Sequence, residues 1–311
     1  MTRVGIVGLG QAGGITLEAL RDIDGATPAA VVDPDRSVAE LCVRCGVPLY
    51  RSLDDMPLAG LDAAVVATPT PSHVRVCRAL VERAGPRLRV LCEKPLATDA
   101  GNVRSLFALA ARRGVRLHVL YHYAYSPEVV WAWERWRGIR EAHGPVIAFE
   151  SRFDDPKPNL GRAERLLASS WADSGINAMS VLARFVSLER VVSGDPVGRC
   201  GRRVTLAFRS GGTVGMGSIS TTWVAPAVVK TTRLTLADGT VLAYDHPAQA
   251  ATLGAARKKT RSLPAASVAL ARYRAMLTAY LSDDPSLFGE DVSLRLHALL
   301  ADGAAGRRTR S

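Results

Sequence analysis

A glycine-rich segment near the start of the chain, Gly8-Leu9-Gly10-Gln11-Ala12-Gly13, constrains its fold more than any other feature. It follows a short apolar run at residues 3–7 and opens an amphipathic stretch at about 11–21. In the GxGxxG pattern, the glycines allow a tight turn, close approach of the backbone to a pyrophosphate and close helix–strand packing. The N-terminus of the following helix offers N–H groups and a positive dipole end to the anion. A purely structural turn is the alternative, but the strand–turn–helix context favours dinucleotide binding at these residues.

Short apolar runs alternate with amphipathic stretches as far as residue 120. Four further runs have the continuous apolar character of buried strands, at 29–32, 63–67, 89–92 and 116–120. Helical stretches lie between them, at about 36–45, 73–83 and 102–113. This alternation predicts a parallel sheet covered by helices on both faces, which is the doubly wound α/β fold. We therefore expect a dinucleotide-binding Rossmann domain over residues 1–120.

Residues 121–311 show a different pattern. Helical stretches at about 127–137 and 163–185 enclose a strand at 145–149, and the second stretch is interrupted near Asp173-Ser174-Gly175. Two pairs of strand-like runs, 203–208 with 213–222 and 232–236 with 240–244, surround glycine-containing turn signals typical of hairpins. Helices at 266–281 and 292–301 follow. We predict an α+β domain over 121–311, with a largely antiparallel sheet, that binds substrate and forms oligomers.

Asp33 lies 20 residues beyond Gly13, at the end of the second predicted strand. A carboxylate at this place can accept hydrogen bonds from ribose hydroxyls, although a helix-capping aspartate is the structural alternative. Asp33 would repel a 2′-phosphate, which favours NAD. Arg36 is close enough to hold a 2′-phosphate, so NADP stays open.

The composition excludes several classes of protein. The net charge of +11 could indicate a nucleic-acid partner, but only five of the 40 basic residues are lysine, and the densest basic clusters, at 257–261 and 307–310, lack interleaved aromatics. Five irregularly spaced cysteines predict neither a disulfide framework nor a metal site. No apolar run approaches the roughly 20 residues of a membrane span, and the start of the chain does not resemble a signal peptide. We expect a soluble, cytoplasmic protein without a nucleic-acid or membrane partner.

Two segments that follow predicted strands carry a family resemblance. They are Ala67-Thr68-Pro69-Thr70-Pro71-Ser72-His73 and Cys92-Glu93-Lys94-Pro95. Together with the glycine loop they resemble the glucose–fructose oxidoreductase / inositol dehydrogenase (Gfo/Idh/MocA) family. The resemblance implies that the cofactor site also includes Thr68, Pro69, His73, Glu93 and Lys94. It implies a catalytic role for Lys94, which fits the chemistry: an ammonium can give up a proton, whereas a guanidinium effectively cannot.

A third segment, Trp171-Ala172-Asp173-Ser174-Gly175-Ile176-Asn177-Ala178-Met179-Ser180, resembles the family's DxGxHxxD pattern with two departures. Asn177 replaces the histidine and Ser180 replaces the last aspartate. On a helix, residues 173 and 177 would share a face, so both could reach one substrate. An asparagine can orient a substrate but cannot act as a base. The resemblance implies catalytic and substrate-binding roles for Asp173 and Asn177.

The phrase Gly175–Ser180 and the pair Tyr121-His122 are similar to the family's aldose 1-dehydrogenase subgroup. In that interpretation His122 contacts nicotinamide or substrate, and a packed core histidine is the alternative. The stretch 150–159 does not resemble the subgroup's sugar-contacting segment. The polar residues within it, Asp154, Asp155 and Lys157, are expected to form a solvated loop, with a loop that closes over substrate as the alternative.

Three functions are compatible with these residues. The first is NAD(P)-dependent hydride transfer to or from a sugar-like hydroxyl or carbonyl carbon, with aldose C1 as the specific case. The second is reduction of an imine or keto-sugar in secondary metabolism. The third is a non-catalytic nicotinamide-binding sensor. An antiparallel sheet with one open face further predicts a homodimer or homotetramer.

Overall fold

The computed structural model describes residues 1–254, 256–259 and 265–306, without the side chains of 256–259, 265 and 266. The basic side chains of 257–261 and 307–310 therefore lie outside the described part. The chain forms two compact units. The first comprises Met1–Leu120 and Ala269–Leu294, and the second comprises Tyr121–Val268 and Arg295–Ser311.

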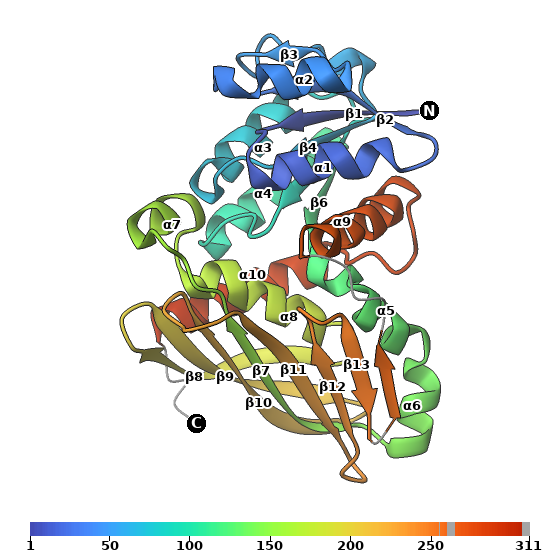
Figure 1. Cartoon of the computed structure of the whole chain (residues 1–311), viewed down its shortest axis with the longest axis vertical. Helices are drawn as coiled ribbons and strands as arrows, with labels where there is room; N and C mark the ends of the chain where they lie inside the picture. Colours follow the sequence, from blue (N-terminus) through green and yellow to red (C-terminus); the bar gives the residue numbers. More distant parts are fainter. Residues whose placement is uncertain (255, 260–264, 307–311) are drawn as a thin grey trace. The chain divides into compact units, whose positions relative to one another are not determined.

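The first unit contains a six-stranded parallel sheet in the order β3-β2-β1-β4-β5-β6 (Figure 1). Its central strands are almost wholly apolar and buried, because helices cover both faces of a parallel sheet. The predicted doubly wound fold is thus confirmed. The strands are β1 (Thr2–Val7), β2 (Ala26–Val32), β3 (Leu49–Tyr50), β4 (Ala63–Val66), β5 (Arg89–Glu93) and β6 (Arg116–Leu120).

The helices of the first unit begin and end close to where their periodicity predicts. Gly46 and Gly114 end two of them in the left-handed conformation that favours glycine after a helix. The predicted helix at 36–45 is divided, because a 3-10 turn (Arg36–Val38) precedes its regular part. The helices are α1 (Gln11–Arg21), α2 (Ala39–Cys45), α3 (His73–Arg83) and α4 (Ala100–Arg113).

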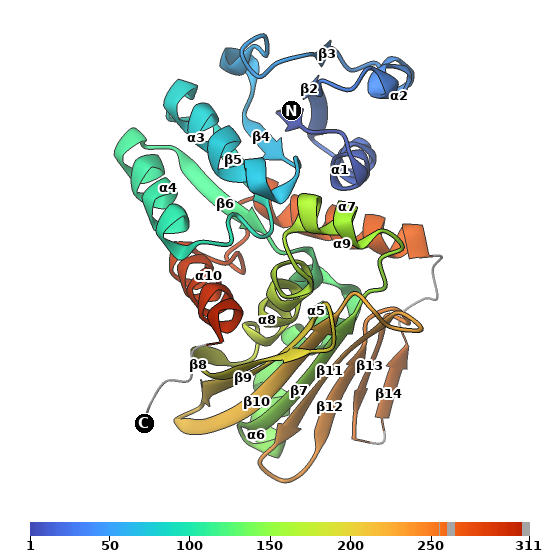
Figure 2. The same ribbon diagram turned by 90° about the vertical axis from the view of Figure 1, so that its left-hand side faces the viewer.

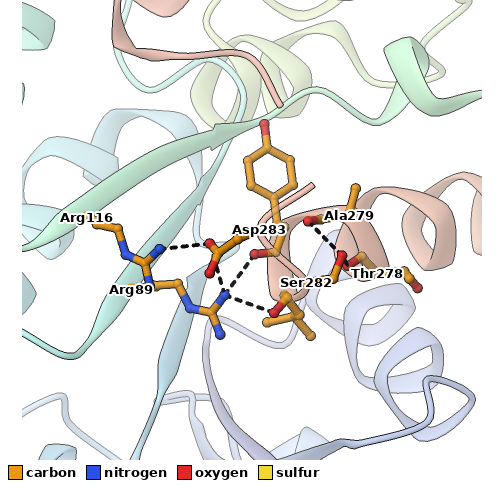
Figure 3. Close-up of polar contacts among 8 residues, drawn as sticks. Arg89, Arg116, Thr278, Ala279, Ser282 and Asp283 are labelled. Carbon is orange, nitrogen blue, oxygen red and sulfur yellow. Dashed lines mark hydrogen bonds and ion pairs between the residues drawn. The ribbon is translucent and has the colours of Figure 1, made fainter. Parts of the chain in front are cut away.

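Helix α9 (Ala265–Leu281) follows the strands of the second unit in sequence, but from Ala269 it belongs to the first unit. The buried side chain of Arg89 in β5 donates hydrogen bonds to the carbonyls of Tyr280 and Leu281 at the end of this helix (Figure 3). The Asp283 carboxylate lies 2.8 Å from Arg116 and 3.6 Å from Arg89. These contacts satisfy carbonyls that the end of a helix leaves without an intrahelical partner.

The second unit contains an eight-stranded sheet in the order β14-β13-β12-β11-β7-β10-β9-β8, in which only β7 and β10 pair in parallel. Both predicted hairpins are present, as β9–β10 and β11–β12. The strands are β7 (Val146–Asp154), β8 (Ser187–Val197), β9 (Gly201–Ser210), β10 (Thr213–Thr222), β11 (Val229–Leu236), β12 (Val241–Asp245), β13 (Ala250–Leu253) and β14 (Ala256–Lys259).

Strand β8 was not predicted, because two register shifts, between Leu188 and Arg190 and between Val191 and Ser193, break the alternation of its buried residues. Strand β7 runs five residues beyond its predicted end. The predicted helix at 127–137 ends at Glu134, and a second helix begins at Trp136. The helices are α5 (Pro127–Glu134), α6 (Trp136–His143), α7 (Leu160–Leu167), α8 (Ile176–Leu182) and α10 (Glu290–Ala305).

The two faces of this sheet differ. Helices α5, α6 and α8 lie along one face (Figure 2), where Phe149, Phe153 and Leu234 are buried. On the other face Val214 and Met216 of β10 are 59% and 60% exposed. One face of the sheet therefore forms the core of the unit, and the opposite face is open in a single chain.

Candidate functional site

The carboxyl ends of four neighbouring strands of the first unit carry the predicted cofactor residues. The glycine loop follows β1, Asp33 follows β2, Thr68 and Pro69 follow β4, and Lys94 follows β5. Because the strands are parallel, these residues share one edge of the sheet. The edge includes the point between β1 and β4 where the strand order reverses, which is where dinucleotides bind in this class of fold.

The glycine loop is too tightly packed at two positions for any side chain. Gly8 has a φ of +93°, and a Cβ there would lie 2.8 Å from the Ala67 carbonyl oxygen. A Cβ on Gly13 would lie 2.0 Å from the Gly8 oxygen. By contrast, a Cβ on Gly10 would meet no atom within 4 Å, and no side chain caps the N-terminus of α1. An uncapped helix N-terminus beside open space fits a bound pyrophosphate.

The Asp33 carboxylate is held firmly at this edge. One oxygen accepts a hydrogen bond from the backbone N–H of Leu9 at 2.6 Å, and the other accepts from the N–H of Asp35 at 2.8 Å. Each carboxylate oxygen retains capacity for a second donor. Arg36, at the start of the next 3-10 turn, is exposed. Asp33 therefore joins the second strand to the glycine loop and offers acceptors of the kind that ribose hydroxyls require.

His73 connects two of the loops at this edge. Its ring is 1% exposed, with Nε2 at 2.7 Å from the Thr68 carbonyl oxygen and Nδ1 at 2.8 Å from that of Pro95. Burial lowers the pKa of the imidazole, although both carbonyl contacts oppose this effect. With both nitrogens directed at backbone, His73 fixes the position of the segments that carry Thr68 and Lys94.

Lys94 follows the last residue of β5 directly and is half-buried. Its backbone N–H donates to the Glu93 carboxylate at 3.2 Å. Glu93 is itself buried. The structure therefore brings the lysine to the same sheet edge as the glycine loop, on a segment anchored by a buried carboxylate and by His73.

The third motif segment lies in the second unit. It begins with a π-helical turn, Trp171–Gly175, which leads directly into α8. The Trp171 indole donates to the Leu300 carbonyl at 2.8 Å, and its ring lies so close to Gly175 that a Cβ there would be 2.4 Å from it. The predicted interruption near residues 173–175 is therefore a wider helical turn. Such turns occur often at functional sites.

Asp173 lies in this turn and Asn177 in the first turn of α8, and they are 8% and 6% exposed. The Asn177 side-chain amide donates to the backbone carbonyl of Asp173 at 3.1 Å, while its buried Oδ1 has no hydrogen-bond partner in the described part of the chain. The Ser180 hydroxyl, where the family pattern has an aspartate, donates to the Asn177 carbonyl at 2.7 Å. Asn177 thus supports the backbone beneath Asp173 and keeps one acceptor available.

The expectation of a solvated loop at Asp154, Asp155 and Lys157 is wrong. Asp154 is the buried last residue of β7, and the backbone after it continues to pair with β10, through Asp155 N–H to the Thr222 carbonyl at 3.0 Å. The Lys157 ammonium lies 2.7 Å from the Asp155 carboxylate and 3.8 Å from that of Asp173. Pairing with β10 therefore places a lysine next to the motif aspartate.

Lys230, on β11, lies beside the same carboxylates, and the sequence analysis did not predict it as a site residue. Its ammonium lies 3.3 Å from Asp155 and 5.8 Å from the centre of the Tyr123 ring. Burial alone would favour its neutral form, but Tyr123 and the carboxylates of Asp155 and Asp173 outweigh burial and raise the pKa of Lys230. A signal did exist, because Lys157 and Lys230 are two of only five lysines in an arginine-rich chain.

His122 begins a short 3-10 helix, His122–Tyr125, and is half-buried. Its ring centre lies 4.9 Å from that of Tyr123, the residue that contacts Lys230. His122 therefore lies next to Tyr123. We use the name polar cluster for Tyr123, Asp155, Lys157, Asp173 and Lys230.

Comparison with known proteins identifies sequence relatives mainly over the first unit. Residues 2–121 match the model of the GFO_IDH_MocA oxidoreductase family, described as an NAD-binding Rossmann fold. Inositol 2-dehydrogenase of Leifsonia xyli is 38% identical over 34% of this chain and 32% of its own length. D-apiose dehydrogenase of Paraburkholderia graminis is 33% identical over 55% of this chain and 45% of its own length. Both matches thus cover less than half of the relative.

The fold is shared over nearly the whole chain. The structure of GenD2 from gentamicin A biosynthesis, in complex with NAD, superimposes with a TM-score of 0.78 over 98% of this chain and 95% of its own. Its sequence is only 23% identical, so this likeness concerns the fold alone. No helix in the described ranges has the length and apolar character needed to cross a membrane. Residues 2–121 therefore resemble the NAD-binding Rossmann domain of the Gfo/Idh/MocA oxidoreductase family, and the whole chain shares the fold of GenD2.

Proposed function

We propose that the protein is an NAD(P)-dependent oxidoreductase that moves a hydride between the nicotinamide and a sugar-like carbon bearing a hydroxyl or carbonyl. The observation that carries the proposal is the position of Lys94 on the same sheet edge as the glycine loop and Asp33. A titratable ammonium at that edge suits a reaction that accompanies hydride transfer with proton transfer. Relatives named inositol and D-apiose dehydrogenase support a polyol or sugar substrate.

The cofactor would be held by groups of the first unit. The N-terminus of α1 and the backbone of the glycine loop would bind the pyrophosphate, and Asp33 would accept hydrogen bonds from the adenosine ribose. When bound, the nicotinamide supplies the hydride acceptor or donor. We propose NAD as the preferred form, because the Asp33 carboxylate would repel a 2′-phosphate.

Proton transfer would fall to the chain's own residues. Lys94 hydrogen-bonds the reacting oxygen and shares the proton with Asp173. Asp173 accepts the hydroxyl proton during oxidation, and Asn177 orients the substrate through the acceptor that it keeps available. His122 contacts the substrate beside the polar cluster. An anomeric hydroxyl is more acidic than a secondary alcohol, so aldose C1 oxidation suits a site in which Asn177 replaces a histidine.

A substrate panel tests the function. We expect oxidation of at least one polyol or aldose, among them myo-inositol, galactose, arabinose and apiose, with a higher kcat/KM for NAD⁺ than for NADP⁺. The measurement is NAD(P)H absorbance under steady-state conditions. A parallel panel of cyclic imines and keto-sugars with NADPH would reveal the reductase alternative. Tight cofactor binding without turnover in either panel would contradict the enzyme and favour the sensor.

We also propose that the open sheet face of the second unit pairs with a second copy, to form a homodimer or a dimer of dimers. Met216 lies opposite Ala148 and Ala207 on the neighbouring strands, so small residues surround an exposed apolar side chain. Such a surface allows close approach of a second sheet.

A charge placed on this face should prevent the pairing. We expect the wild-type chain to be a dimer or tetramer in light-scattering chromatography and the Met216→Glu variant to have a smaller mass. Val43→Glu is the control, because Val43 is 79% exposed on α2 of the first unit. A monomeric wild type, or equal masses for all three proteins, would exclude this interface.

A further inference from the structure

We infer that Lys157 is a positioning residue for Asp173, whose carboxylate it keeps ionised and directed so that Asp173 serves as the proton acceptor that Asn177 cannot be. The inference rests on the proposed function and deepens it. It concerns groups of the second unit alone, and it assigns a role to a residue outside the three motif segments.

The geometry places the Lys157 ammonium between two carboxylates. It lies 2.7 Å from an oxygen of Asp155 and 3.8 Å from one of Asp173. The three side chains retain only 24%, 22% and 11% of their full exposure. Water screens such partly buried charges less than it screens surface pairs, so the cation should have a large effect on the ionisation of Asp173.

The backbone makes this position a fixed one. The Lys157 N–H donates to the Trp223 carbonyl at 3.1 Å, which extends the pairing of β7 with β10 beyond the end of both strands. Asp173 lies in the π-helical turn that Trp171 anchors, and its N–H donates to the carbonyl of Ser169, two residues before that turn, at 2.9 Å. The backbone of both partners of the ion pair is therefore held by hydrogen bonds.

The other groups around Asp173 come from several elements. Lys230 on β11 adds a second positive charge, and Asp155, after β7, adds a second negative one. Asn177 on α8 contributes an uncharged amide to the Asp173 backbone. Two lysines thus lie beside two aspartates, and the Lys157 ammonium lies within 4 Å of both carboxylates.

The chemistry explains why this arrangement would matter here. A proton acceptor has to be ionised at the working pH, and an opposite charge within about 4–6 Å favours the ionised carboxylate. A histidine at position 177 would provide a base with its own titration near neutrality, but asparagine does not titrate. Proton transfer then depends on an ionised Asp173, and the Lys157 ammonium favours that ionised form.

The test compares Lys157→Met, which removes the charge, with Lys157→Arg, which keeps it. Loss of the cation raises the pKa of Asp173, so the acidic limb of the kcat/KM profile for oxidation should move to higher pH by about one unit in Lys157→Met. In Lys157→Arg the limb should stay within a few tenths of a unit of the wild type. Asp155→Asn removes a competing negative charge, so its limb should stay in place or move to lower pH.

A second readout does not depend on turnover. The ¹³C resonance of the Asp173 carboxyl, assigned by its loss in Asp173→Asn, can be titrated in the wild type and in each variant. A higher midpoint in Lys157→Met than in the wild type supports the inference even if no substrate is found, in which case the proposed function alone fails. Equal midpoints in folded wild type and Lys157→Met overturn it, and so does a shift of equal size in Lys157→Arg. If Lys157→Met fails to fold, Lys157→Gln replaces it under the same criteria.

Discussion

Replacement of Lys94 by alanine is expected to lower kcat by about two to four orders of magnitude, the usual contribution of a group that transfers or shares a proton in the transition state. Affinity for NADH should remain nearly unchanged. The reason is that the Lys94 backbone, which His73 and Glu93 help to position, stays in place while the ammonium is lost. The measurements are steady-state kinetics with the best substrate from the panel and NADH binding by fluorescence.

The arginine variant separates charge from proton transfer. Lys94→Arg keeps a positive charge, but a guanidinium cannot release a proton in the working pH range. We therefore expect Lys94→Arg to stay at least about tenfold below wild type in kcat, and to lie above Lys94→Ala only if charge stabilisation contributes separately. Unchanged turnover in Lys94→Ala would remove Lys94 from the mechanism and leave a nucleotide-binding fold without an assigned acid.

The candidate cofactor site of the first unit could be predicted from sequence because its determinants are local. Strand β1, the glycine loop and helix α1 follow one another within 20 residues, and each shows its own signal of apolar run, glycine spacing or amphipathic period. The parallel sheet then brings the ends of β1, β2, β4 and β5 to one edge without further information. The structure directs both ring nitrogens of His73 to backbone carbonyls of the loops at this edge.

The candidate site residues of the second unit were predictable only at Asp173 and Asn177, where the resemblance carried the prediction. Lys157 and Lys230 are 73 residues apart, and they meet at Asp155 because β7 pairs with β11. Register of this kind depends on tertiary packing and leaves no local periodic signal. The expected solvated loop failed for the same reason, since its backbone pairs with β10.

Substitution in the glycine loop should also have a large effect on cofactor binding, because Gly8, Gly10 and Gly13 have very different surroundings. Gly13→Ala should abolish measurable NADH binding and lower the thermal unfolding midpoint. Its Cβ would lie 2.0 Å from the Gly8 carbonyl oxygen, which is backbone and can move only if α1 separates from β1. Overpacking of this kind costs about 1–3 kcal/mol or more. A shift of the loop would also displace the Leu9 N–H from Asp33.

Gly10→Ala and Gly14→Ala distinguish loss of the cofactor site from loss of the fold. Neither Cβ would meet an atom within 4 Å, so both variants should fold, and Gly14→Ala should gain about 0.5–1 kcal/mol from helix propensity. Gly10 borders the space that we assign to the pyrophosphate, so Gly10→Ala should weaken NADH binding at least about tenfold, equivalent to about 1.4 kcal/mol. Gly14→Ala should bind NADH as the wild type does. Isothermal titration calorimetry measures NADH affinity, and thermal unfolding measures stability. Wild-type NADH affinity in Gly10→Ala would contradict pyrophosphate binding at the N-terminus of α1.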